Sequence, residues 1–329
     1  MNNDVISVEE LEKVLNDILK SGEYSLFAPV MIGKTLDFAE VSEGMEAVIS
    51  DAVPYKSPKE VLFPQNEMMM AFNNCEVREN EYDRKTVIFG AKPCDAEALR
   101  ILNEVFMSGK FQDTFFKRRF DNNVIIVLGC REEKPGCFCA ERGIYKEFSD
   151  FCDILLIPVD GGYNISCISD KGNRLGKEFF GTDQMAAVGF VGQNEAVKTE
   201  LDEALDEALL FDIIDWEKAS EICQGCGICT FVCPTCHCFD IKDVSEKNET
   251  KRYRCWDSCM YPKFTLHASG HNPRGTIKER FRQRVLHKYL YIKKNLGYTA
   301  CTGCGRCIRS CPAGMSIKKV ILSLMEALP

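Results

Sequence analysis

Two copies of one cysteine motif constrain this chain more than any other feature. Each copy reads C-x₂-C-x₂-C-x₃-C-P, and the copies occupy residues 223–234 and 301–312 of a 329-residue chain. Three closely spaced thiolates, followed by a fourth cysteine before a proline, are typical of bacterial-type proteins that hold two [4Fe–4S] clusters. The motif therefore predicts two cubane clusters.

The spacing also predicts which cysteines share a cluster, because the fourth cysteine of each run ligates the other cluster in such proteins. One predicted quartet is Cys223, Cys226, Cys229 and Cys311. The other quartet is Cys301, Cys304, Cys307 and Cys233. Zinc is a poorer interpretation, since its sites use two C-x-x-C pairs or Cys/His mixtures. Disulfides are typical of small secreted chains, and this chain is neither small nor predicted to be exported.

A further group of four cysteines lies in the first half of the chain. We predict strands at residues 86–89 and 124–128, joined by a helix at 96–106 that makes them parallel neighbours. Two cysteines follow these strands, at the carboxyl edge where open α/β sheets place their sites, and two more lie on the next loop. The four are Cys94, Cys130, Cys137 and Cys139. A third [4Fe–4S] cluster is the preferred interpretation; a structural zinc ion and unliganded packing thiols are the alternatives.

Seven cysteines belong to none of these groups. Three stand alone and are interpreted as core residues: Cys75, Cys152 and Cys167. Four lie between the two motifs: Cys236, Cys238, Cys255 and Cys259. Cys236, Cys238 and Cys259, together with Cys255 or His237, could form another metal site, but we favour a role in packing.

The first 200 residues predict an α/β domain. A capping box at Ser7–Glu10 opens a helix that runs to about Lys20. Short apolar strands follow, the last of them near residues 154–159 and 164–168.

Residues 201–329 predict an α+β two-[4Fe–4S] ferredoxin-like domain with a long helical insertion at 234–300. A long surface insertion is tolerated because it adds little loop-closure entropy. The insertion contains a predicted basic helix at about 276–295. This helix could pair with the acidic connector at 195–221, with an acidic partner or with the negative charge of the clusters.

Composition narrows the functional classes. The net charge of −8 argues against nucleic-acid binding, and no apolar run is long enough to span a membrane. The N-terminus lacks a signal-peptide pattern, so we expect a cytoplasmic protein. In a reducing compartment, 19 cysteines indicate metal ligation.

These residues resemble those of the iron–sulfur subunit of anaerobic sulfite reductase and of the related beta subunits of cytosolic sulfhydrogenases. The resemblance covers most of the chain. It is carried by Lys-Pro-Cys94-Asp, Gly-Cys-Phe-Cys139, the two motifs, Thr-Cys-His-Cys238, Trp256-Asp-Ser-Cys-Met and Ser269-Gly-His-Asn-Pro-Arg. One departure follows Cys139, where Ala-Glu-Arg-Gly143 replaces the Ser-x-Gly turn common in the family.

The resemblance implies an electron-transfer subunit. Family members relay electrons from a flavin- and NAD(P)H-binding subunit to a catalytic subunit. We expect a sirohaem sulfite reductase as that catalytic subunit; the alternative is a NiFe (sulf)hydrogenase. The chain carries no nucleotide-binding fingerprint and no nucleophile–base arrangement, so no substrate site of its own is expected. A cluster-based redox sensor and a stand-alone enzyme are less favoured, because no output module is visible and four cysteines would close the N-terminal cluster.

Overall fold

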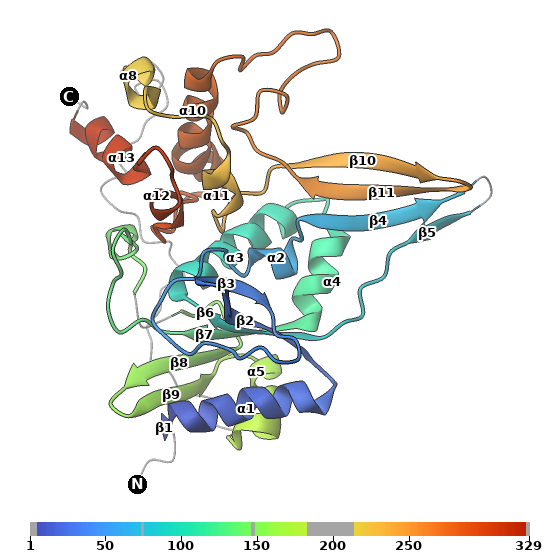
Figure 1. The fold of residues 1–329 in the computed structure, drawn as a ribbon, viewed down its shortest axis with the longest axis vertical. Helices are drawn as coiled ribbons and strands as arrows, with labels where there is room; N and C mark the ends of the chain where they lie inside the picture. The colour runs from blue at the N-terminus through green and yellow to red at the C-terminus, as the bar shows by residue number, and fades with distance from the viewer. Residues whose placement is uncertain (1–4, 74–75, 146–148, 183–213, 327–329) are drawn as a thin grey trace.

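A computed structural model describes residues 5–73, 76–145, 149–182 and 214–326. Its main sheet has seven strands in the order β1-β9-β8-β7-β6-β2-β3 (Figure 1). The central strands β2, β6, β7 and β8 run parallel, and the outer pairings are antiparallel. The strands are β1 Val5–Ile6, β2 Ser25–Ile32, β3 Thr35–Glu40, β6 Thr86–Ala91, β7 Asn123–Leu128, β8 Ile154–Val159 and β9 Gly162–Cys167.

Helices cover both faces of this sheet, which explains why β6 and β7 are buried along their whole length. One face packs against α1 (Val8–Ser21) and α5 (Asp170–Leu175). The other face packs against α3 (Pro93–Met107) and α4 (Thr114–Asn122). Successive β6 residues alternate between the two cores as strand geometry requires, with Val87 in the first and Ile88 in the second.

The predicted first helix is confirmed as α1. The Ser7 hydroxyl accepts from the Glu10 amide at 3.2 Å, and the Glu10 carboxylate accepts from the Ser7 amide at 2.9 Å. Gly22 ends the helix with a φ of 69°. The buried positions Leu11, Leu15 and Ile18 recur at helical spacing and anchor α1 to the sheet.

The predicted parallel pair is also confirmed. β6 and β7 are hydrogen-bonded in parallel, with Ile88 opposite Ile125. The helix between them begins three residues before the predicted start, because Pro93 is accepted in the first turn of a helix. Cys94 therefore lies in the first turn of α3, and Cys130 follows the end of β7.

A second sheet changes the description of the insertion. Its order is β10-β11-β4-β5, and it projects beyond the helices of the first sheet (Figure 1). The strands are β4 Asn66–Phe72, β5 Val77–Glu79, β10 Phe239–Glu246 and β11 Glu249–Trp256. The insertion is thus partly a β-hairpin and not only helical. The predicted domain boundary at residue 200 falls outside the described residues and stays a prediction, although this sheet joins strands from both sides of it.

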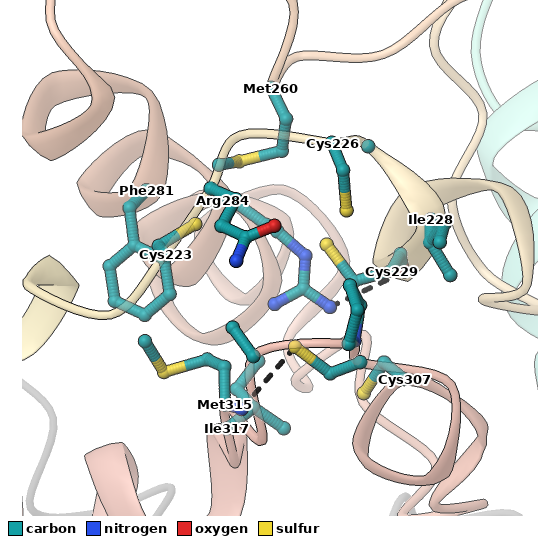
Figure 2. A pocket seen from close by; sticks show the side chains of 15 residues that line it. Cys223, Cys226, Ile228, Cys229, Met260, Phe281, Arg284, Cys307, Met315 and Ile317 are labelled. Carbon is teal, nitrogen blue, oxygen red and sulfur yellow. Dashed lines mark hydrogen bonds between the residues drawn. The ribbon is translucent and has the colours of Figure 1, made fainter.

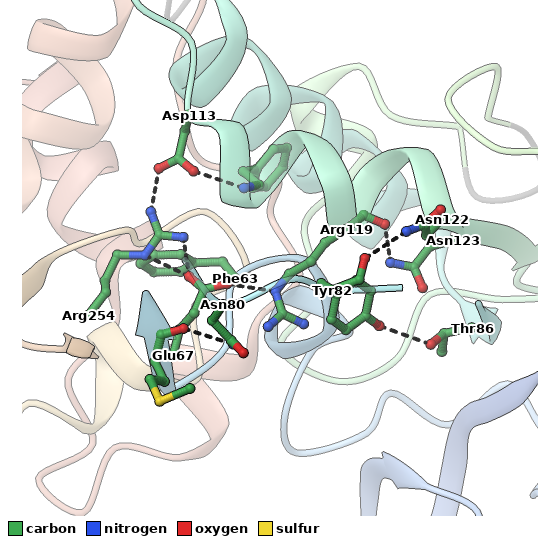
Figure 3. A network of polar contacts seen from close by, with 12 residues as sticks. Phe63, Glu67, Asn80, Tyr82, Thr86, Asp113, Arg119, Asn122, Asn123 and Arg254 are labelled. Atoms are coloured by element: carbon green, nitrogen blue, oxygen red, sulfur yellow. Dashed lines mark hydrogen bonds and ion pairs between the residues drawn. The ribbon is translucent and has the colours of Figure 1, made fainter. Parts of the chain in front are cut away.

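A buried ionic network fixes the hairpin to the first half of the chain (Figure 3). Arg254 of β11 is 1% exposed and binds the carboxylates of Glu67 and Asp113. Arg119 of α4 binds the other oxygen of Glu67 at 2.7 Å. The network joins β11, β4 and α4, so the hairpin has a fixed position on the α/β core.

The predicted basic helix is confirmed as a continuous helical segment. It comprises α10 (Ile277–Leu286), a π-helical turn (His287–Tyr291) and α11 (Ile292–Leu296), and Gly297 ends it with a φ of 87°. Its buried side packs with α8 (Trp216–Ser220) and α13 (Ile317–Glu326). Most of the predicted acidic connector lies outside the described residues. Within the described part of the chain, no helix has the length and apolarity to cross a membrane.

Candidate iron–sulfur centres

The two cysteine motifs adopt the same local structure. In each, a cysteine-rich loop leads into a single helical turn, α9 (Ile228–Phe231) in the first and α12 (Arg306–Arg309) in the second. Gly227 and Gly305 precede these turns with φ values of 80° and 72°, in the left-handed region that favours glycine. α9 and α12 pack against each other, so the two loops lie side by side.

A cavity of about 510 Å³, counted with its open mouth, lies beside the first motif (Figure 2). All four members of the first predicted quartet line it: Cys223, Cys226, Cys229 and Cys311. Met260, Phe281 and Ile317 form part of its apolar wall. Cys226 is exposed, so this cavity opens toward the surface.

A second cavity of about 320 Å³ lies beside the second motif. All four members of the second predicted quartet line it: Cys301, Cys304, Cys307 and Cys233. The structure thus brings each predicted quartet together around one cavity, and each quartet takes its fourth cysteine from the other motif. That each quartet ligates one cluster stays a prediction. Cys307 and Arg284 line both cavities, which therefore adjoin.

The donor chemistry of these cavities suits iron–sulfur clusters. Burial raises the pKa of Cys304 to about 11 and that of Cys307 to about 12, so these thiols hold their protons until a metal displaces them. A hydrogen bond from Cys236, working against burial, lowers the pKa of Cys233 well below its usual value. Burial opposes the charge of Arg284, but the negative charge that the surrounding cysteines carry when ionised, that of Cys229 first, raises its pKa. Four sulfur donors beside buried cations fit an anionic cluster.

Three cysteines of the predicted third site, Cys94, Cys137 and Cys139, approach the second motif. The loop that carries Cys137 and Cys139 is fixed by a 2.8 Å hydrogen bond from the Phe138 amide to the Gly303 carbonyl. A Cβ atom on Gly303 would lie 2.6 Å from the Phe138 carbonyl, and one on Gly305 would lie 2.3 Å from the Gly136 oxygen. The loop and the second motif therefore touch backbone to backbone.

The thiols of the third group lie close to one another. Cys94 and Cys139 are buried and pack with Cys304 of the second quartet. Burial and then the charges of Cys137, Glu133 and Cys130 raise the pKa of Cys139 to about 12. Cys137 Sγ lies 3.5 Å from a guanidinium nitrogen of Arg309. Among the described residues, no three His, Cys, Asp or Glu side chains form a ready site for a single metal ion. Ligation of a third cluster stays a prediction.

One buried ion pair joins the third group to the second motif. Asp95, next to Cys94, forms a two-pronged pair with Arg306, which lies between Cys304 and Cys307. The two contacts measure 2.5 and 2.9 Å, and both side chains are 1% exposed. Arg306 also donates to the Pro54 carbonyl at 2.9 Å. The sheet edge and the second cysteine loop are therefore held in one arrangement.

Four of the remaining cysteines lie in or against hydrophobic cores: Cys152, Cys167, Cys238 and Cys259. Cys152 and Cys167 are buried in the two cores of the main sheet, as predicted, and Cys75 lies outside the described residues. A hydrogen bond with Cys259 lowers the pKa of Cys238 to about 7. Apart from the undescribed residues, nothing in the structure assembles these cysteines into the further metal site considered above.

Comparison with known proteins agrees with this geometry. A family model described as a 4Fe–4S dicluster domain matches residues 222–315, so this region is a two-cluster domain. The chain is 32% identical over 315 residues to sulfhydrogenase 2 subunit beta of Pyrococcus furiosus. That alignment covers 92% of this chain and 93% of the relative. The chain belongs to the sulfhydrogenase beta-subunit family. No solved structure matches it.

Membership of the sulfhydrogenase beta-subunit family confirms the resemblance seen in the sequence. It does not support the preferred sulfite reductase interpretation and favours the sulfhydrogenase alternative. The sequence reasoning missed the two cations of the insertion that reach the cavities, Arg284 and Lys288. The density of Lys and Arg in the basic helix was the available signal, but it did not indicate which side chains point inward.

Proposed function

We propose that this chain is the iron–sulfur electron-transfer subunit of a NiFe (sulf)hydrogenase complex. It relays electrons between a flavin- and NAD(P)H-binding subunit and the NiFe catalytic subunit. The observation that carries the proposal is the near full-length similarity to a sulfhydrogenase beta subunit, together with two adjoining cavities that are each lined by one cysteine quartet.

The arrangement of the three cysteine groups supports a relay. The third group contacts the second quartet through Cys304, and the second quartet adjoins the first through Cys307. The groups therefore follow one another in the order third, second, first. Successive close contacts of this kind are what electron transfer between partner subunits needs.

The ends of this row are the points where partner subunits exchange electrons. At one end the first cavity opens beside the exposed Cys226. At the other end, Cys130 and Cys137 are half-buried and thus closer to solvent than Cys94 and Cys139. The second quartet lies between these ends, with Cys304 buried. A partner at each end would make the chain a bridge.

The third group holds a third [4Fe–4S] cluster in this proposal, with Cys94, Cys130, Cys137 and Cys139 as ligands. Support comes from the close approach of the thiols and from the Asp95–Arg306 pair that fixes Cys94 beside the second motif. The buried Lys92, whose ammonium group donates to the Ser50 carbonyl at 2.6 Å, interacts with Cys130 and Cys94 and provides nearby positive charge.

Metal analysis of the chain, purified without oxygen, tests the clusters. Three cubanes predict about twelve irons and as many acid-labile sulfides per chain, falling to about eight in a Cys94→Ser/Cys130→Ser variant. Zinc is measured in parallel. About eight irons in the wild type, with or without zinc, would refute the third cluster and leave the two-cluster domain in place.

Analysis of the native complex tests the partner assignment. Anaerobic purification of the tagged chain from its own cells is expected to yield nickel and flavin in fixed ratio to the chain. Hydrogen gas is expected to bleach the cluster absorbance. A complex that contains sirohaem, whose clusters are oxidised by sulfite and not reduced by hydrogen, would overturn the hydrogenase assignment.

A further inference from the structure

One buried arginine, Arg284, reaches both cluster cavities. It belongs to α10 of the insertion, is 4% exposed and lines the first and the second cavity. Figure 2 shows its guanidinium group pointing inward between Cys229 and Cys307. A long hydrogen bond runs from its Nη2 to the Cys229 carbonyl at 3.4 Å.

The charge of Arg284 has no carboxylate counter-ion among the described residues. Its buried Nε has no hydrogen-bond partner, and no described carboxylate forms an ion pair with it. Arg254, in contrast, binds Glu67 and Asp113, and Arg306 binds Asp95. Arg280 also has no carboxylate partner among the described residues, but it donates to two backbone carbonyls and lines neither cavity. A buried cation without a counter-charge is strongly unfavourable. The position of Arg284 therefore requires an anion in the cavities.

We propose that Arg284 is a shared counter-ion of the two clusters, donating N–H groups to sulfur at the boundary of the cavities and raising both reduction potentials. The inference rests on the two-cluster part of the proposed function. Four thiolates outnumber the positive charge of a cubane core, so each cluster is anionic, and reduction makes it more so. A fixed cation stabilises the reduced form more than the oxidised form, and hydrogen bonds to sulfur act in the same direction. The guanidinium fork has enough donors to serve both sides.

The same helical segment offers matched comparisons. Lys288, four residues later, is 3% exposed and lines only the second cavity. Arg280, four residues earlier, is 6% exposed but lines neither cavity, and it donates to the carbonyls of Arg274 and Gly275. The three cations lie in one continuous helical segment and are similarly buried. Arg284 lines both cavities, Lys288 lines only the second, and Arg280 lines neither.

Redox titration of the purified chain with chemical mediators, followed by electron paramagnetic resonance, tests the proposal. Arg284→Gln is expected to shift both cluster potentials to more negative values. Arg284→Lys keeps the positive charge, so its cluster potentials are expected to stay close to those of the wild type. Lys288→Met is expected to shift the second cluster alone, and Arg280→Gln neither cluster. No cysteine of the third group lines a cavity with Arg284, so the potential of a cluster held by that group provides an internal reference.

Iron analysis of each variant separates the possible outcomes. If Arg284→Gln loses clusters that Arg284→Lys retains, the positive charge is required and the proposal holds. Full iron with unchanged potentials in Arg284→Gln, or a shift of one cluster only, would overturn it. So would cluster loss in both Arg284 variants while Arg280→Gln keeps its iron, because packing and not charge would then be responsible. The titration needs no partner subunit, so its result is independent of the hydrogenase assignment. Fewer than about eight irons in the wild type would refute the two clusters themselves.

Discussion

Gly225 and Gly303 occupy equivalent positions in the two cysteine motifs and differ in what surrounds them. Their φ values are 66° and 65°, so an alanine at either position carries the same backbone strain. At Gly225 the nearest atom to an added Cβ is 3.7 Å away, on Ile277, which is an ordinary contact. At Gly303 the added Cβ would lie 2.6 Å from the Phe138 carbonyl and 2.7 Å from the Cys139 amide. Only the second substitution therefore displaces the loop of the third group.

The two substitutions should differ in free energy as well as in iron content. A left-handed conformation costs an alanine about 1–2 kcal/mol, and this is the whole expected effect of Gly225→Ala. Gly303→Ala should also lose the hydrogen bond from the Phe138 amide, adding about 1 kcal/mol. Moving the loop would take Cys137 and Cys139 out of position. We therefore expect Gly303→Ala to retain about eight irons where Gly225→Ala retains about twelve.

The assay combines iron and sulfide analysis with urea unfolding followed by cluster absorbance, all without oxygen. Gly225→Ala serves as the control for strain. Equal iron content in the two variants, in a wild type that holds about twelve irons, would refute the reasoning that the Gly303 contact positions ligands of a third cluster.

Three further predictions concern ligation, stability and pH. If ligation is swapped, Cys223→Ser/Cys311→Ser loses about four irons, whereas Cys223→Ser/Cys233→Ser loses about eight; equal losses would contradict the swap. Arg254→Met leaves the buried Glu67 with Arg119 as its one cation and is expected to lower the free energy of unfolding by about 1–3 kcal/mol, with iron unchanged; an unaltered urea midpoint would show that the pair is dispensable. Burial raises the pKa of Cys304 to about 11, so iron must displace the proton of this thiol when it binds. The affinity of the apo-chain for iron should therefore rise with pH, by up to about tenfold per pH unit for each proton that is displaced. Chelator competition measures this, and an affinity independent of pH would exclude protonated thiols as ligands.

Local patterns in the sequence predicted much of the α/β core. The capping box and the helical spacing of apolar residues placed α1, and two apolar strands joined by a helix placed β6, α3 and β7. Motif spacing predicted both quartets that line the cavities. These features depend on residues that are close in sequence, or on a ligation pattern that the motif spacing predicts.

The hairpin of the insertion gave no comparable signal. All eight residues of β10 are exposed, and the apolar alternation that begins at Phe239 and Ile241 breaks at Val244, so the sequence does not show the pattern of a half-buried strand. Its turn contains Lys247 with a φ of 50° and has no glycine, although tight hairpin turns usually show Asn-Gly or Asp-Gly. The hairpin is instead positioned by contacts such as that of Arg254 with Glu67, which lie far apart in the sequence.

The insertion illustrates the difference between what a fold tolerates and what it uses. Loop-closure entropy explains why a long segment between the two motifs is tolerated, and it predicts nothing about function. The structure places Phe281 in the wall of the first cavity, Lys288 in the wall of the second and Arg284 in both. The two motifs without the insertion would therefore lack part of each cavity wall and the buried positive charge that anionic clusters need. The cysteine spacing specifies the cluster type, whereas the electrostatic environment of the clusters depends on a segment that the motif does not include.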